Sequence, residues 1–257
     1  MARIITVANQ KGGVGKTTTA VNLSASLAAA EKRTLLVDMD PQANACSGCG
    51  IDKTEVISTI YNALLGETSA AEVIQKTELG FLDVLPSNTD LIGAEIELIS
   101  SAKREYRLKQ VLAEVSGDYE YIIVDCPPSL GVLTVNSLTA ADNILVPLQC
   151  EFYAMEGLGQ LMQTVRLVQQ GLNPKLEICG ILLTMFDGRN NLCHQVSDEI
   201  RNHFGDKVFS AVIPRNVRLS EAPSYGQPAI LYDISSRGAR AYMALAKEII
   251  EAGGRHG

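Results

Sequence analysis

Seven short apolar runs, separated by segments of helical periodicity, restrict the folds open to this chain more than any other feature of its sequence. The runs occupy residues 4–8, 34–38, 82–86, 121–125, 143–147, 178–184 and 208–213. They are rich in isoleucine, valine and leucine without polar alternation, which is typical of strands buried on both faces of a parallel sheet. We therefore predict an α/β fold in which helices cover both faces of one mostly parallel sheet.

Two segments have apolar residues along one helical face, one between two of these runs and one after the last run. Apolar residues recur there at three- and four-residue spacing. They are Leu158, Leu161, Met162, Val165 and Val168 in the first segment, and Tyr242, Leu245, Ile249 and Ile250 within 238–252 in the second. Strands that alternate with helices form βαβ units with right-handed crossovers, so residues 1–257 are expected to form a single doubly wound domain.

Composition and charge exclude several classes of protein. The 257 residues include 22 Lys and Arg against 29 Asp and Glu, a formal net charge of −7, and 46% of residues are apolar. This balance is typical of a globular protein and argues against one that coats nucleic acid through its whole surface. No apolar run approaches the roughly 18 residues of a membrane span and no signal peptide is recognised, so we expect a cytoplasmic protein. The first run begins at Ile4, so we expect no separate DNA-binding module before it.

The six cysteines are expected to be free thiols in a cytoplasmic protein. Only Cys46 and Cys49 form a Cys-x-x-Cys pair, and the sequence has no second pair that would complete a zinc site. We interpret these two as small loop residues after a strand, although the sequence alone leaves a redox role open.

A glycine- and lysine-rich segment, NQKGGVGKTTTAVNL, directly follows the first apolar run at residues 9–23. In a G-x-x-x-x-G-K-[ST] loop between a strand and a helix, backbone N–H groups cradle phosphates, the lysine reaches the β- and γ-phosphates, and the hydroxyl binds Mg²⁺. Gly15, Lys16 and Thr17 occupy the last three places, but Gln10 stands at the first glycine place and a second lysine, Lys11, follows it. The segment predicts a P-loop NTPase. The expected phosphate-binding residues are Lys11, Gly12, Gly13, Val14, Gly15, Lys16, Thr17 and Thr18.

Carboxylates end two other predicted strands. Asp38 and Asp40 alternate with Met39 at the end of the second run, and Asp125 closes the run YIIVD. Ligands bind at the carboxyl ends of strands in such sheets. An apolar strand that ends in one aspartate has the form of a Walker B carboxylate, which holds the metal ion, often through water. We therefore expect a Mg²⁺ site near Thr17 and Asp125, with Asp38 and Asp40 at the same ligand-binding edge.

The KGGVGKTT segment resembles the deviant Walker A ATPases, which include the ParA/Soj partition proteins, MinD and the nitrogenase iron protein. Five further stretches resemble the ParA/Soj group in particular, and together they cover nearly the whole chain. They are VDMDPQANACSGCGI (37–51), DCPPSLGVLTVNSL (125–138), CEFYAMEGL (150–158), LLTMFDGRNNL (182–192) and VIPRNVRLSEAPSYGQP (212–228). The chain departs from the family where Ala43 is followed by Asn44 and then Cys46. A glycine and a non-cysteine residue are more usual there.

The resemblance implies an ATPase that switches between states. It implies that Lys11 reaches across a nucleotide-sandwich homodimer to the partner's phosphates. It also implies that Asp40 positions or activates the attacking water, with Mg²⁺-linked contacts possible from both Asp38 and Asp40. The match around IPRN implies base contacts near Pro214 and Asn216. The chain lacks the Asn-Lys-x-Asp run used by guanine-specific GTPases, which favours ATP.

The resemblance also implies non-specific binding to duplex DNA in the ATP state and stimulation of hydrolysis by a ParB-like partner. Arg189 and Arg218 match the DNA-contacting arginines of the family, whereas Arg215 and Arg240 are weaker candidates. An acidic chain binds phosphates only if its cations gather on one face, which dimerisation can complete. We expect such a protein to associate with the nucleoid.

Two other functions of the wider family remain as alternatives. A MinD-like membrane switch needs a basic amphipathic C-terminal helix, but Glu248 and Glu251 offset Arg240 and Lys247 in this tail. We therefore expect no stable membrane association. An iron–sulfur protein needs a cysteine from each protomer near the dimer axis, for which Cys126 is the conceivable ligand.

Overall fold

The fold is an α/β sandwich built on one eight-stranded sheet, with strand order β3-β4-β2-β5-β1-β6-β7-β8. A computed structural model describes residues 1–151 and 154–253, so two residues of the CEFYAMEGL stretch and the last four of the chain lie outside it. The strands are β1 (Arg3–Val7), β2 (Thr34–Asp38), β3 (Gln75–Lys76), β4 (Leu82–Leu85), β5 (Tyr121–Asp125), β6 (Asn143–Gln149), β7 (Glu177–Phe186) and β8 (Val208–Pro214).

The predicted fold class is confirmed, with one added strand. Each of the seven apolar runs coincides with a strand, and every strand pair is parallel except β3 with β4. The short edge strand β3 was not predicted, because Gln75 and Lys76 are both exposed and form no apolar pattern.

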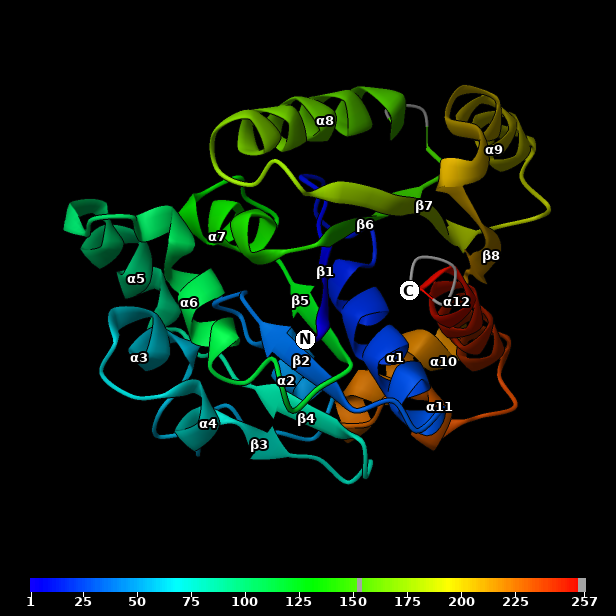
Figure 1. The fold of residues 1–257 in the computed structure, drawn as a ribbon. Helices are drawn as coiled ribbons and strands as arrows, with labels where there is room; N and C mark the ends of the chain where they lie inside the picture. The colour runs from blue at the N-terminus through cyan, green and yellow to red at the C-terminus, as the bar shows by residue number, and fades with distance from the viewer. Residues whose placement is uncertain (152–153, 254–257) are drawn as a thin grey trace.

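Helices cover both faces of the sheet (Figure 1). They are α1 (Lys16–Ala29), α2 (Asn44–Ser47), α3 (Ile60–Leu65), α4 (Ala70–Val73), α5 (Leu91–Glu97), α6 (Arg107–Ala113), α7 (Val132–Ala140), α8 (Ala154–Gly171), α9 (Asn191–Phe204), α10 (Val217–Glu221), α11 (Ala229–Tyr232) and α12 (Arg237–Gly253). Short 3₁₀ turns lie at Leu98–Ser100, Arg104–Tyr106, Gly205–Lys207 and Ala222–Tyr225.

Two hydrophobic cores lie on opposite faces of the sheet. In β5, Ile122 and Val124 belong to the core that includes Leu158 and Val165 of α8. Ile123, between them, belongs to the core that includes Leu245 of α12. Alternate residues of one strand are therefore buried on opposite faces, which explains its continuous apolar run.

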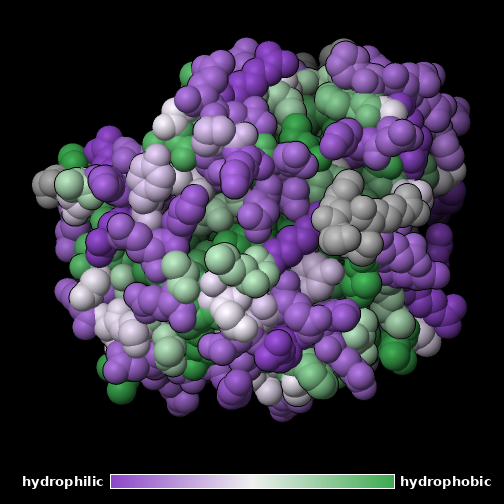
Figure 2. Space-filling model, viewed as in Figure 1, coloured by the Kyte–Doolittle hydropathy of each residue, from purple (hydrophilic) through white to green (hydrophobic). Residues whose placement is uncertain are grey.

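The order of the strands places the ligand-binding edge beside β1. The chain runs from β1 to β2 on one side, and β6, β7 and β8 follow on the other side. Such a reversal leaves a crevice at the carboxyl ends of the strands. On the face shown in Figure 2 the surface is mostly hydrophilic, with small apolar groups between the helices.

Candidate nucleotide-binding site

The loop between β1 and α1 has the geometry of an anion cradle. Gly13 and Gly15 have φ angles of +74° and +86°, in the left-handed region that favours glycine. Within the part of the chain that the structure describes, the backbone N–H groups from Gly12 to Thr18 donate to no acceptor, and the first helical bond runs from the Thr19 N–H to the Gly15 carbonyl. A row of free N–H groups at a helix N-terminus binds anions such as phosphates.

The two lysines of this loop point in different directions. Lys16 is buried, and its Nζ donates to the Lys11 carbonyl at 3.2 Å, inside the loop. Burial lowers the pKa of Lys16, an effect that Asp125 and Asp40 partly offset. The Lys11 side chain is 42% exposed and forms an ion pair with Glu151, outside the loop. The loop therefore holds one cation within the cradle and presents the other at the surface.

Asp125 and Asp38 lie side by side at the ends of β5 and β2, where their Cα atoms are partners in the sheet. Both carboxyl groups are fully buried. Neither oxygen of Asp125 accepts a hydrogen bond of normal geometry, although the Thr17 hydroxyl lies close enough to lower its pKa slightly. Burial and the charge of Asp38 outweigh this effect and raise the pKa of Asp125 well above its usual range. A buried carboxyl without partners, beside a threonine hydroxyl and a phosphate cradle, fits a hydrated metal ion.

Asp38 and Asp40 differ in how many hydrogen bonds their carboxylate oxygens accept. Asp38 accepts hydrogen bonds from the Cys46 N–H at 3.0 Å, the Cys46 thiol at 3.2 Å and the Asp40 N–H at 3.1 Å. Burial raises the pKa of Asp38 to about 6 despite these bonds. Asp40 accepts the Gln42 N–H at 2.9 Å through Oδ1, which leaves its second oxygen for a water molecule. Asp38 therefore supports the loop, and Asp40 has the free oxygen.

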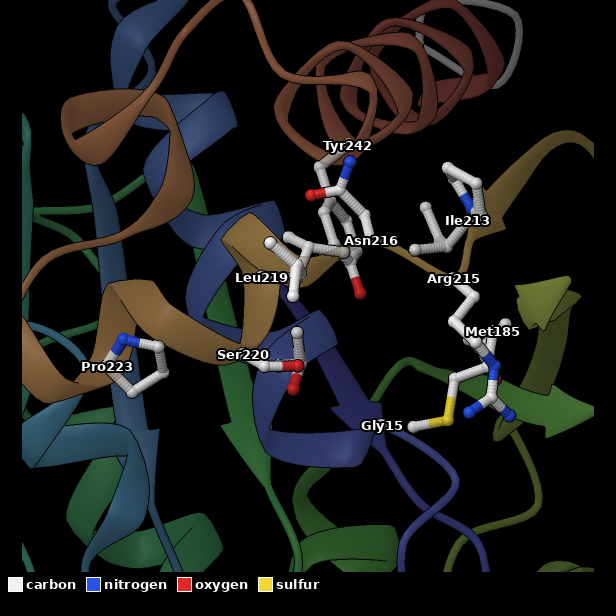
Figure 3. Close-up of a pocket in the computed structure, with 13 residues that line it drawn as sticks. Gly15, Met185, Ile213, Arg215, Asn216, Leu219, Ser220, Pro223 and Tyr242 are labelled. Carbon is white, nitrogen blue, oxygen red and sulfur yellow. The ribbon is translucent and has the colours of Figure 1, made fainter.

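A pocket of about 530 Å³ adjoins the loop on the side of α10 and α12 (Figure 3). Pro214 and Asn216 line it, as does Arg215 between them. Asn216 is the N-cap of α10, since its Oδ1 accepts the Arg218 N–H at 2.9 Å. The pocket thus connects the phosphate cradle to a partly apolar cavity of the size that small ligands occupy.

The proposed DNA-contacting arginines are exposed and paired within the chain. Arg189 makes a two-pronged ion pair with Asp187, with both N–O distances at 3.0 Å. Arg218 lies 2.9 Å from Glu221 and 3.5 Å from Asp233, with its guanidinium over the Tyr232 ring. The weaker candidates Arg215 and Arg240 are also exposed.

Known proteins resemble this chain over nearly its whole length. A family described as AAA domain matches residues 2–178. The chromosome partitioning protein ParA of Myxococcus xanthus (strain DK1622) is 58% identical, with 98% of this chain and 89% of that protein covered. The sporulation initiation inhibitor protein Soj of Bacillus subtilis (strain 168) is 56% identical, with 98% of this chain and 100% of that protein covered. The chain belongs to the ParA/Soj family of chromosome-partitioning ATPases. Among solved structures, cobyrinic acid a,c-diamide synthase from Mycobacterium smegmatis with bound ADP and magnesium has a TM-score of 0.86 at 40% identity, with 97% of this chain and 94% of that chain covered.

In this ParA/Soj ATPase, much of the pocket beside the cradle is lined by residues that the sequence did not predict. Met185, Leu219 and Tyr242 line it, and they come from β7, α10 and α12. Tyr242 stood in an apolar stripe, whereas Met185 and Leu219 lay only in stretches that resemble the ParA/Soj group, where no role was assigned to them. Tyr242 is core as well, since its hydroxyl pairs with that of Thr19 at 3.1 Å. A left-handed φ of +50° at Met185 marks a special position that the sequence does not reveal.

The loop after β2 contains a second left-handed residue. Ala43, in the stretch where the ParA/Soj family more often has a glycine, has a φ of +53°. Beyond it, Cys46 and Cys49 are buried free thiols, and burial raises the pKa of both. Low thiolate content makes such cysteines unreactive, which argues against a redox role. The expectation that both are loop residues is wrong for Cys46, which lies in the short helix α2, because the chain turns into a helix directly after Ala43.

The structure weakens the two alternatives to a ParA/Soj switch. α12 buries Tyr242, Leu245 and Ile249 against the domain, so these residues are not free to enter a bilayer, and residues 254–257 of the tail lie outside the described range. Among the described helices, none is long and apolar enough to cross a membrane. Cys126 is fully buried, and burial raises the pKa of its thiol to about 12, which does not suit a ligand shared across a protein surface.

Proposed function

We propose that this ATPase is a switch for partitioning a chromosome or plasmid. ATP binding drives a sandwich homodimer that binds duplex DNA without sequence specificity, and hydrolysis stimulated by a ParB-like partner releases the protein. The separation of the two loop lysines carries this proposal. Lys16 is buried in its own cradle, whereas Lys11 is at the surface with only Glu151 as its ion-pair partner among the described residues. A surface lysine can exchange this exposed partner for the phosphates of a second protomer.

ATP and Mg²⁺ are the proposed cofactors. The related synthase from Mycobacterium smegmatis has been solved with ADP and with an ATP analogue, each with magnesium. In this chain Thr17 would hold the ion directly, and Asp125 and Asp40 would hold it through water. Among the described residues, no three His, Cys, Asp or Glu side chains form a metal cluster, as expected where phosphates and waters complete the shell. There the ion would supply positive charge that neutralises the phosphates, and Asp40 would orient the attacking water.

DNA contact is assigned to Arg189 and Arg218, with Arg215 and Arg240 as further candidates. All four are exposed cations on a chain of net charge −7. Phosphate contacts of this kind give affinity without sequence preference. We propose that dimerisation brings the arginines of two protomers onto one face, and that the protein associates with the nucleoid in this state.

Asp40→Ala provides the test of the switch. The variant should bind ATP, lose at least about 90% of ATP hydrolysis, and persist as a dimer whose mass is measured by light scattering. Lys16→Ala is the matched control, since it should lose nucleotide binding and remain monomeric. If Asp40→Ala hydrolysed ATP at the parent rate, the proposed role of the Asp40 carboxylate would be wrong.

A further inference from the structure

Thr184, at the carboxyl end of β7, lies outside the phosphate loop and lines the pocket beside it. Thr184 is 2% exposed, and its hydroxyl donates a 2.8 Å hydrogen bond to the carbonyl of Val14 in the phosphate loop. β6 lies between β7 and the strand that leads into this loop. The bond therefore ties the loop to a strand that is distant both in sequence and in the sheet.

This hydrogen bond fixes the orientation of one peptide group. The peptide between Val14 and Gly15 is planar and trans, so its C=O and N–H point in opposite directions. With the Val14 carbonyl held by Thr184, the Gly15 N–H points away from β7, and it donates to no acceptor within the described residues. Glycine has the widest choice of backbone conformations, so an outside contact is needed to hold this one.

Packing around Gly15 supports the same orientation. A Cβ built on Gly15 would lie 3.9 Å from both the Cβ and Cγ2 of Thr184 and from the Cε of Met185, so these side chains border the space beside Gly15. Figure 3 shows Met185 beside Gly15. At the same strand end the Phe186 carbonyl accepts the Arg215 N–H at 3.1 Å. The end of β7 thus holds the phosphate loop on one side and the wall of the pocket on the other.

We propose that Thr184 is a positioning residue for nucleotide binding. Its hydroxyl turns the Val14–Gly15 peptide so that the Gly15 N–H faces the phosphates of a nucleoside di- or triphosphate. This inference rests on the proposed nucleotide site and deepens it, because it names a residue outside the loop that presets the cradle before the ligand arrives.

Thr184→Val and Thr184→Ser form the critical pair of variants. Valine keeps the shape of threonine and removes the hydroxyl, whereas serine keeps the hydroxyl and removes the methyl. For Thr184→Val we expect the Kd for ATP and for ADP and the KM for ATP to rise about tenfold, with kcat at saturating ATP within about twofold of the parent. Thr184→Ser should stay within about twofold of the parent in all of these.

Thr34→Val is the matched control. Thr34 is also fully buried, and its hydroxyl donates to the Lys32 carbonyl at 2.8 Å, at the opposite end of the sheet. It should lower the melting temperature of the ligand-free protein without changing the Kd for ATP. Thr184→Ala, which adds no methyl beside the carbonyl, replaces valine if Thr184→Val does not fold.

Two results would overturn the inference. One is parental ATP affinity in Thr184→Val or Thr184→Ala. The other is an equal loss in Thr184→Ser, which would assign the effect to the methyl group. If the parent protein itself bound neither ATP nor ADP, the proposed function would fail instead, so the two failures are distinguishable.

Discussion

At the scale of single residues, the main feature is a cluster of buried carboxyl groups beside the phosphate loop. Asp38, Asp40 and Asp125 are all buried, with Lys16 as a nearby cation. The sequence predicted that these groups would meet, because Asp38 and Asp125 end strands at the same sheet edge and Asp40 follows two residues after Asp38. It did not predict that Asp38 would be held by Cys46, because that contact depends on the path of the loop after β2.

The burial of Asp38 makes stability depend on pH. Its folded-state pKa of about 6 exceeds the usual value of about 4, so between these values the folded chain holds a proton that the unfolded chain has lost. Stability should therefore fall as pH rises from about 4 to about 6 and remain lower above it. Without nucleotide or Mg²⁺, Asp38→Asn loses hydrogen bonds at every pH because its NH₂ group faces a donor, but it also removes the cost of the buried charge, so it should destabilise the fold by on the order of 2 kcal/mol less at pH 7 than at pH 4. Urea unfolding across this range measures it; an equal effect of Asp38→Asn at pH 4 and pH 7 would contradict the assignment.

Gly12 allows a test of the sandwich dimer that leaves the fold intact. A Cβ at Gly12 meets nothing within 4 Å in its own chain. We therefore expect Gly12→Val to keep the parent melting temperature within about 2 °C and to bind ATP, but to lose ATP-dependent dimerisation, because its side chain projects toward the second protomer. Light scattering with an ATP analogue provides the measurement.

Gly13 provides the contrast to this variant. At its φ of +74° an alanine is strained, so Gly13→Ala should destabilise the monomer itself, by about 1 kcal/mol. If Gly12→Val dimerised normally, Gly12 would not lie in the dimer interface.

At the scale of elements, α10 joins the nucleotide pocket to the surface that carries Arg218, a link that the sequence did not reveal. Its Leu219 lines the pocket, and Arg218 next to it faces solvent beside Glu221 and Asp233. The apolar runs predicted the large elements because burial on both faces determines their composition. They could not predict α10, a five-residue helix whose place depends on an N-cap and on the loop after β8.

In the proposed DNA complex, the ion pairs of Arg218 would compete with DNA for its guanidinium. Glu221→Gln removes the 2.9 Å partner, so affinity for non-specific DNA in the presence of ATP should rise about two- to threefold at low salt, as expected from an exposed pair. Glu251→Gln changes the net charge equally but disrupts a pair with Lys247 on α12. Fluorescence anisotropy with labelled duplex DNA compares the two. An equal rise in both variants would mean that only net charge matters.

At the scale of the whole molecule, the eight strands of the described residues belong to one sheet, and the single domain over residues 1–257 stays a prediction. The net charge of −7 limits how such a protein can bind DNA. Its DNA contacts must come from a local group of arginines, and in this structure Arg189 and Arg218 are both paired with carboxylates. We therefore expect a monomer to bind DNA weakly and the proposed dimer, which would double the cationic face, to bind it more strongly.

Titration of non-specific duplex DNA tests the proposed switch most directly. Binding is measured with ATP, with ADP and without nucleotide, at about 50 mM and about 200 mM salt. We predict binding with ATP alone, weakened by at least about tenfold at the higher salt and lost in Arg218→Glu. Equal binding with ADP or without nucleotide, or no binding with ATP, would contradict an ATP-dependent DNA switch.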